Sequence, residues 1–510
     1  MPLSHKTHPL ITGTLLLTAA GLLSRVLGFF YRIFLSRTIG AEGLGIYQMI
    51  FPIYGIFFSL CAGSIQTAIS RFTAADPDHA KRTLLSGFSL SFAMSLAAAF
   101  VIRHFSVPLA EHVLMEPRCA PLLSVMAFAI PCTSVHACIC GYYYGKEKVS
   151  VPAAAQLFEQ MIRIFTVFLL ASVCIEKRIP VTVSLAVFGL VAGEAGSALF
   201  VLIFFLLFHE FHENTGRSYS VGQSGNLFSP MAALLALAAP LMANRLVLNL
   251  LQSTETIMIP ERLTVYGLTR SQAVRTYGTL TGMAMPFVLF PSALVNSLAV
   301  VLLPVTARHQ SAGNDSGIAD GISMAFRYSL YLGIFCVGVF TVFGEALGLQ
   351  IFKSQDAGSF IQILAWLCPF LYLATSSGSI LNGLGKTKLT FFHHLISLLV
   401  RIAFVWFGIP EVGIRACLWG MLASEILLAL LHILALRRIV PCDWNAWILI
   451  GKPVFCLLCA LWLFRLFPET LPLPAGLPDF FLTAVQILLL STMYLLFLLF
   501  FHRKQSPAST

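Results

Sequence analysis

The sequence predicts an all-α polytopic membrane protein, and two observations support that fold class. Of the 510 residues, 58% are hydrophobic and only 11% are charged, whereas a soluble protein carries about 25% charged residues. The mean hydropathy is +0.85. Apolar segments of bilayer-spanning length, about 20 residues each, follow one another along the whole chain. The short connections between them leave no room for a soluble domain of ordinary size.

Hydropathy predicts about 14 transmembrane helices. Their expected limits are 10–36, 44–70, 83–103, 119–141, 151–175, 181–208, 229–259, 277–304, 322–351, 358–382, 388–408, 412–436, 447–467 and 479–501. The first segment is too long for a cleavable signal peptide, so we expect it to remain as a span. An even number of spans places both termini on one side. The distribution of Lys and Arg predicts that this side is the cytoplasm, in a bacterial cytoplasmic membrane.

Charge and cysteine usage exclude several other classes of protein. The net charge of +10 is typical of contact with anionic lipid head groups, and we find no nucleic-acid-binding module. Cys456 and Cys459 form a CxxC inside a Leu-rich segment, where helix packing is a better explanation than metal binding. Gly385 and Lys386 resemble the end of a phosphate-binding loop, but Ile380 stands where that motif needs its first Gly. We therefore expect no metal, no cofactor and no ATP hydrolysis.

The first two spans carry polar and charged side chains inside otherwise apolar helices. In the first span, such residues recur at steps of three and four and form one helical stripe. Its members are Thr14, Thr18, Gly21, Arg25, Gly28, Arg32 and Ser36. A charge near the bilayer centre costs roughly 2.5–3.5 kcal/mol. We therefore expect Arg25 and Arg32 to face a bundle interior or a watery cavity. Gln66 belongs to a similar stripe in the second span.

A weak internal repeat relates the two halves of the chain. One stripe of the fifth span matches a stripe of the eleventh at a constant offset; Glu159 corresponds to Ser397, and Arg163 to Arg401. The seventh span resembles the first, because it also has a polar stripe around an intramembrane Arg, Arg245. The predicted domains are a six-helix lobe over 1–208, a cytoplasmic linker over 209–228, a second six-helix lobe over 229–436, and two extra helices with a tail over 437–510. Six spans per lobe imply that a pseudo-twofold axis along the membrane normal relates the lobes, with the transport path at the interface between them.

Four stretches of the chain resemble a known family. They are residues 21–48 (GLLSRVLGFFYRIFLSRTIGAEGLGIYQ), 141–164 (GYYYGKEKVSVPAAAQLFEQMIRI), 245–304 (beginning RLVLNLLQSTETIMIPERL) and 380–388 (ILNGLGKTK). They resemble the multidrug/oligosaccharidyl-lipid/polysaccharide (MOP) exporter superfamily, in the stage V sporulation protein B branch of polysaccharide exporters. Relatives in this branch are thought to flip lipid-linked saccharides, and a characterised type is the MurJ-type lipid II flippase.

The resemblance implies a two-lobed fold with alternating access and a cationic central cavity that receives a pyrophosphate head group. It also implies that the two C-terminal helices form a groove for the polyprenyl tail. The first-span Arg of the family pattern matches Arg25 or Arg32, and Arg245 is its match in the second lobe. The Arg-Asp pair of lipid II flippases is absent here, since Ile33 follows Arg32.

The intramembrane Arg residues suit an anionic head group. The planar guanidinium donates several hydrogen bonds in a geometry that matches phosphate oxygens. We therefore expect Arg25, Arg32 and Arg245 to bind the pyrophosphate. Other polar residues expected to bind the substrate are Gln66, Asn249 and Gln252. The alternative is that each Arg pairs with a carboxylate or with carbonyl groups and only holds helices together.

The intramembrane carboxylates have two interpretations, ion or proton coupling and structural pairing. The residues concerned are Glu159, Arg163, Glu194, Glu255, Arg401 and Glu425. Glu159 and Arg163 are four residues apart and can pair on one helix face. Glu194 and Glu425, at equivalent places in the two lobes, could instead take up a proton or a cation.

These observations favour a flippase for a polyprenyl-pyrophosphate-linked saccharide, either lipid II or a related peptidoglycan precursor, with the spore cortex as one destination. The alternatives are an exporter of another lipid-linked polysaccharide unit, a cation-coupled multidrug antiporter, a membrane glycan-synthesis enzyme and a non-transporting scaffold. An enzyme is disfavoured because the loops are short. The expected partners are the lipid-linked substrate, membrane lipids and cell-wall synthesis proteins.

Overall fold

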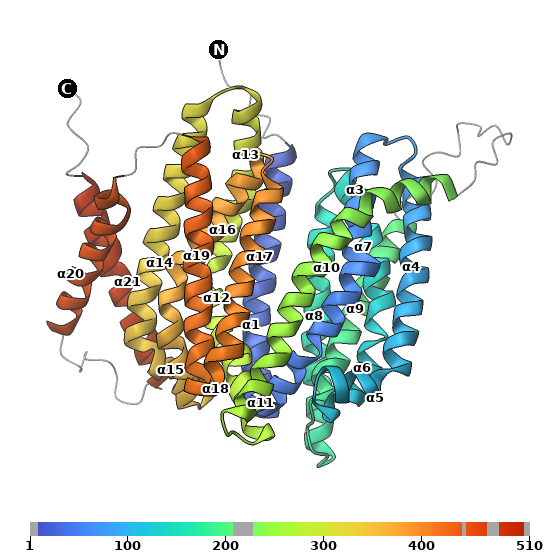
Figure 1. The fold of residues 1–510 in the computed structure, drawn as a ribbon, viewed down its shortest axis with the longest axis horizontal. Coiled ribbons are helices and arrows are strands. Elements are labelled where there is room, and N and C mark those ends of the chain that lie inside the picture. Colours follow the sequence, from blue (N-terminus) through green and yellow to red (C-terminus); the bar gives the residue numbers. More distant parts are fainter. Residues whose placement is uncertain (1–8, 208–227, 441–444, 467–478, 504–510) are drawn as a thin grey trace. The chain divides into compact units, whose positions relative to one another are not determined.

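The computed structural model describes residues 9–207, 228–440, 445–466 and 479–503, and these ranges contain helices and no β-strand (Figure 1). The all-α fold class is therefore confirmed. By contacts between Cα atoms the chain divides into two compact units, Met1–Glu261 (unit 1) and Arg262–Thr510 (unit 2). The predicted linker over 209–228 lies, except for its last residue, outside the described residues. The predicted division into lobes stays a prediction.

The helices of unit 1 are α1 (Pro9–Met49), α2 (Phe51–Phe58), η1 (Ser59–Gly63), α3 (Ser64–Ala75), α4 (Ala80–His104), α5 (Ser106–Pro108), η2 (Leu109–Val113), η3 (Pro117–Cys119), α6 (Ala120–Met126), α7 (Ala129–Gly145), α8 (Ser150–Glu176), α9 (Ser184–Leu207) and most of α10 (Phe228–Val265). Those of unit 2 are α11 (Arg270–Gly278), η4 (Thr279–Ala284), α12 (Met285–Leu289), α13 (Ser292–Ser311), α14 (Asp315–Phe352), α15 (Gln355–Leu364), η5 (Ala365–Leu367), α16 (Cys368–Gly383), α17 (Thr387–Ala403), η6 (Phe404–Gly408), α18 (Ile409–Val412), α19 (Ile414–Ile439), η7 (Trp447–Gly451), α20 (Lys452–Leu466) and α21 (Asp479–Arg503).

Every predicted span overlaps helical segments, although several spans are broken. Among the described residues, 12 helical stretches are long and apolar enough to cross a membrane. The number is 13 if Pro117–Met126 and Ala129–Gly145, which meet at 44°, form one bent span. The stretch Leu16–Ala75 includes most of the first predicted span and all of the second. They are separated at Gly40, whose φ of 71° is a conformation that glycine adopts without strain. The count of 14 and the lobe symmetry stay predictions.

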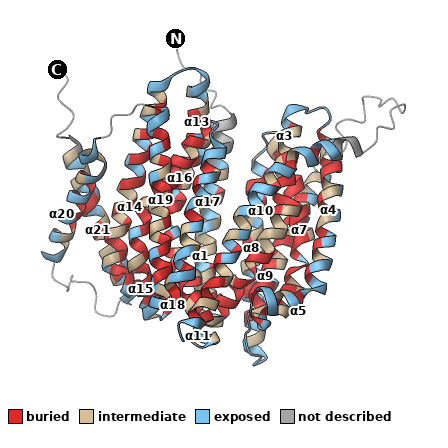
Figure 2. Ribbon diagram, viewed as in Figure 1, coloured by how far each residue is buried: buried red, intermediate tan, exposed pale blue. Residues whose placement is uncertain are grey.

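The surface of the helices has the inverted polarity of a membrane protein. Buried residues lie mainly where helices face one another, and outward-facing surfaces are exposed (Figure 2). Many of the exposed side chains are large and apolar; Phe165, Phe407 and Trp462 are 66–73% exposed. A soluble protein rarely shows apolar patches of this extent. These surfaces suit the hydrocarbon core of a bilayer, and the chain is a multi-pass membrane protein.

Small residues let the helices of unit 1 approach closely. A Cβ on Gly189 of α9 would stand 2.2 Å from the Cγ2 atom of Val167 on α8, and a Cβ on Gly193 would stand 3.0 Å from the carbonyl oxygen of Glu159. Close backbone approach at small residues is the usual basis of helix packing within membranes. The contact brings the polar side chains of α8 opposite those of α9.

The last two helices pack against α14 within unit 2. The Tyr331 hydroxyl on α14 donates a hydrogen bond to the Ile448 carbonyl oxygen at 2.9 Å. The Tyr494 hydroxyl on α21 donates to the Tyr331 carbonyl oxygen at 3.0 Å. These bonds between side chains and backbone fasten η7 and α21 to a long helix of unit 2 and satisfy polar groups that would be costly to expose to lipid.

Candidate functional site

A cavity of about 320 Å³ lies inside unit 1 and is lined mainly by polar side chains. Its lining residues are Tyr54, Phe58, Gln66, Thr133, His136, Ala137, Glu159 and Glu194. They come from α2, α3, α7, α8 and α9. Of the residues predicted as site residues, the structure therefore brings Gln66, Glu159 and Glu194 to one cavity.

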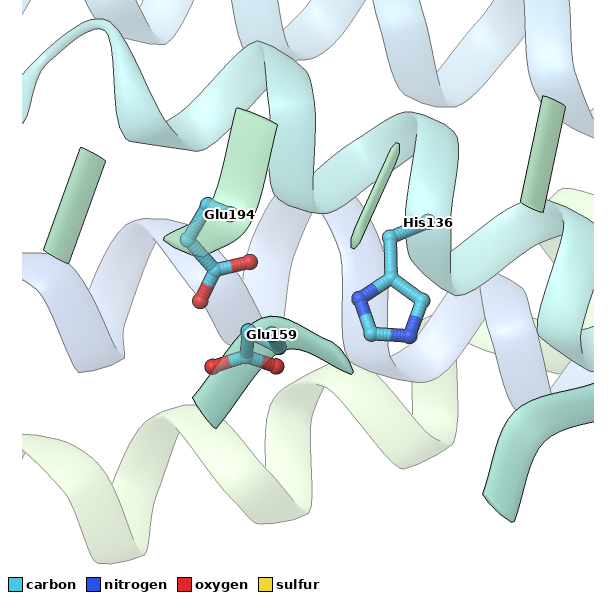
Figure 3. A group of neighbouring side chains, drawn as sticks. All are labelled: His136, Glu159 and Glu194. Carbon is cyan, nitrogen blue, oxygen red and sulfur yellow. The ribbon is translucent and has the colours of Figure 1, made fainter. Parts of the chain in front are cut away.

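Three ionisable side chains meet at this cavity (Figure 3). His136 comes from α7, Glu159 from α8 and Glu194 from α9, and one ligand atom from each lies within 4.8 Å of the others. Imidazole and carboxylate groups at this separation can share a proton or hold a metal ion.

Hydrogen bonds orient Glu194 and His136. The Tyr54 hydroxyl donates to Oε1 of Glu194 at 3.0 Å and lies 2.9 Å from the Thr133 hydroxyl. The second carboxylate oxygen of Glu194, Oε2, is buried and has no hydrogen-bond partner among the described residues. The hydroxyl of Ser197 lies 3.0 Å from Nδ1 of His136. A buried acceptor without a donor costs about 1–3 kcal/mol, and more when the group is charged.

Arg163 places a positive charge beside the two carboxylates. Its Nη2 atom donates to Oε1 of Glu159, one helical turn away, and lies 3.9 Å from Oε1 of Glu194. The side chains of Arg163 and Glu159 are 18% and 19% exposed. In this low-dielectric setting the ion pair interacts more strongly than it would at a protein surface. Arg163 thus balances the charge of one carboxylate.

The residues predicted on the seventh span lie against the broken second span. Asn249 donates from Nδ2 to the Gly55 carbonyl oxygen at 3.1 Å. Arg245 donates from Nη2 to the Thr67 hydroxyl at 3.2 Å, and its guanidinium fills the space where a Cβ on Gly63 would stand. The Arg245 side chain remains exposed. Its other N–H donors are therefore available to a ligand.

The remaining predicted residues do not line this cavity, although Arg32 is close enough to Arg163 to interact with it electrostatically. Arg25 is exposed on α1 and has no polar contact within the described residues, whereas Arg32 is half-buried on the same helix. Gln252 is exposed and Glu255 is buried, both on α10. The others are in unit 2, where half-buried Arg401 and Glu425 lie on the packed helices α17 and α19.

Sequence reasoning missed His136, Tyr54 and Thr133. His136 lies in the fourth predicted span, and an ionisable residue inside a span is a signal in itself. The two hydroxyl groups left no comparable signal, because Tyr and Thr are common in membrane helices and their partners are distant in the chain.

Residues 10–310 match the model of a family described as polysaccharide biosynthesis protein. The chain belongs to this family. A relative, the stage V sporulation protein B of Bacillus subtilis (strain 168), is 27% identical over 84% of this chain and 84% of its own length. The membership confirms the predicted resemblance to the polysaccharide biosynthesis branch that includes stage V sporulation protein B.

Solved structures share the fold of this family member. A lipid II flippase MurJ in an inward closed conformation has a TM-score of 0.75 at 16% identity, covering 96% of this chain and 99% of the flippase. An inward-facing multidrug resistance MATE transporter of the MOP superfamily has a TM-score of 0.63 at 14% identity, covering 83% of this chain and 97% of the transporter. By their names these two structures are a flippase and a transporter, and they show the fold that this family member shares.

Proposed function

We propose that this protein translocates a polyprenyl-pyrophosphate-linked saccharide, lipid II or a related peptidoglycan precursor, from the inner to the outer leaflet of the cytoplasmic membrane by alternating access. Three similarities support the proposal. The family is one of polysaccharide biosynthesis, a relative acts in sporulation by its name, and the fold matches a lipid II flippase over more of the chain than it matches a multidrug transporter. The sporulation relative supports the spore cortex as one destination of the precursor.

The observation that carries the proposal is the unpaired positive charge of Arg25. It lies well inside an apolar helix, is exposed, and has no polar partner among the described residues. Keeping a charge within a bilayer is costly, and such residues usually serve a ligand or an ion path. Arg245 also keeps N–H donors that a ligand could use, because Thr67 accepts a hydrogen bond from only one of its N–H groups. A pyrophosphate provides the oxygen acceptors that such groups lack.

The test is a leaflet-accessibility assay with lipid II in liposomes that contain the purified protein. We expect the Arg25→Ala/Arg32→Ala/Arg245→Ala variant to flip lipid II at least about tenfold more slowly than wild type, because each lost phosphate contact is worth about 1.5–3 kcal/mol. The matched control is Lys177→Ala, which removes an exposed positive charge after α8. Unchanged flipping by the folded triple variant would contradict the Arg assignment, and no flipping by folded wild type would contradict lipid II as cargo.

A second arm of the assay separates the proposed cargo from the multidrug alternative. Cationic dyes would be repelled by the Arg side chains, so we expect wild-type liposomes to leave dye accumulation unchanged. Dye transport without lipid II flipping would favour the multidrug antiporter. An imposed membrane potential tests the energy source, since moving one charge across 100 mV is worth about 2.3 kcal/mol. If the flipping rate does not depend on the membrane potential, an H⁺ or Na⁺ gradient is the alternative energy source.

The positive-inside rule predicts that both termini face the cytoplasm. We expect a green fluorescent protein fused to either end to fluoresce, and alkaline phosphatase fused to either end to be inactive, because each reporter works on only one side of the membrane. A phosphatase that is active at one end would contradict the even number of spans. Activity at both ends would invert the predicted orientation.

A further inference from the structure

The group formed by His136, Glu159 and Glu194 has the features of a cation site rather than of a packing contact. Each side chain comes from a different helix, and all three line the same cavity. Ligands around a first-row metal lie about 2.0–2.2 Å from the ion, which places them roughly 3–3.5 Å from one another. The separations of up to 4.8 Å would therefore close if each ligand atom shifted by about 1 Å.

A second, independent observation is the unpartnered oxygen of Glu194. This residue is only 6% exposed, Tyr54 occupies its Oε1 atom, and Oε2 has no hydrogen-bond partner within the described part of the chain. Because the residue lines the cavity, an ion placed there would satisfy the oxygen. Native proteins seldom leave a buried carboxylate oxygen without a partner, so the vacant acceptor points to a ligand.

The charges of the group also favour a cation. When both are ionised, Glu159 and Glu194 together carry two negative charges, and Arg163 compensates one of them through its bond to Glu159. Its distance of 3.9 Å from Glu194 is too long for a hydrogen bond. With a neutral imidazole at His136, the group retains one net negative charge inside a membrane protein.

The donor set selects the class of cation. Carboxylate oxygens alone would suit Mg²⁺ or Ca²⁺, but an imidazole nitrogen added to two carboxylates suits first-row transition metals. The ring of His136 is held by the Ser197 hydroxyl and the carboxylate of Glu194 by Tyr54. Such outer hydrogen bonds orient ligands in known metal sites.

We propose that His136, Glu159 and Glu194 bind one divalent transition-metal cation of the Mn²⁺, Co²⁺ or Zn²⁺ class in the cavity of unit 1. The proposal of this metal site does not depend on the proposed cargo, and metal binding can be measured without any lipid-linked substrate. The bound ion would link α7, α8 and α9. We therefore expect ion binding to stabilise the helix bundle, and we expect the binding to saturate.

The test measures Co²⁺ and Mn²⁺ binding to the full-length protein in detergent after chelator treatment. We expect one Co²⁺ per chain with visible absorption bands of mixed nitrogen and oxygen coordination, and a rise of the Tm in the presence of Mn²⁺. Glu194→Gln and His136→Asn should each weaken binding at least tenfold. The controls Glu111→Gln and His112→Asn remove the same chemical groups at exposed positions of η2 and should bind as wild type does.

A further variant keeps the test decisive if a ligand substitution fails to fold. Arg163→Gln removes the competing positive charge, so we expect Mn²⁺ to raise its Tm more than that of wild type. A purely structural cluster would show no such rescue. The proposal is overturned if Co²⁺ binding is absent, if it is unchanged in Glu194→Gln and His136→Asn, or if Na⁺ stabilises the protein while Mn²⁺ does not.

Discussion

Replacing Arg163 with glutamine is expected to destabilise unit 1 by about 3 kcal/mol, because removal of one partner leaves buried carboxylate charge uncompensated. Glu159 loses its hydrogen bond and Glu194 loses the positive charge 3.9 Å away. Both carboxylates are largely buried, so water replaces the guanidinium poorly. The measurement is thermal unfolding of the purified variant in detergent, followed by a flipping assay at a temperature where it remains folded.

The Arg163→Gln/Glu159→Gln double variant is the control for this prediction. It removes the pair together and should recover most of the lost stability, since no unpaired charge remains at Glu159. A double-mutant cycle then gives the coupling energy of the pair. Equal stability of Arg163→Gln and wild type would show that water or another group compensates the carboxylates, and would contradict the role assigned to Arg163.

Gly348→Ala is expected to destabilise unit 2 by about 3 kcal/mol through overpacking. A Cβ at this position on α14 would stand 2.2 Å from the Gly358 backbone nitrogen and 2.4 Å from its Cα on α15. These atoms belong to the backbone, so no side-chain rotation can relieve the clash and the two helices must separate. Thermal unfolding in detergent measures the loss, and the flipping rate would fall in proportion to the folded fraction.

Gly321→Ala is the matched control, because it lies on the same helix with no atom within 4 Å of its Cβ position. There the substitution should be neutral or should stabilise the protein by up to about 1 kcal/mol, as alanine is the better helix former. If both variants lowered the Tm equally, the effect would not arise from the contact between α14 and α15.

Parts of the site followed from the sequence and parts did not. The spacing of four residues between Glu159 and Arg163 sufficed to predict that they can pair, since such neighbours meet on any helix. The meeting of Glu194 with His136 could not be foreseen, because it depends on how α7 and α9 pack. The interpretation of Arg25 and Arg245 as head-group ligands stays a prediction, and so does coupling at Glu255, Arg401 and Glu425.

The sequence by itself determined the membrane environment, the all-helical fold class and the approximate place of each span, because hydropathy is a local property summed over about 20 residues. Only the tertiary structure decided where a predicted span breaks internally, as between Met126 and Ala129, and which polar side chains share a cavity. The physical reason is that helices in lipid associate through close contacts at small residues. The partners of glycines such as Gly189 and Gly348 are visible only once the chain has folded.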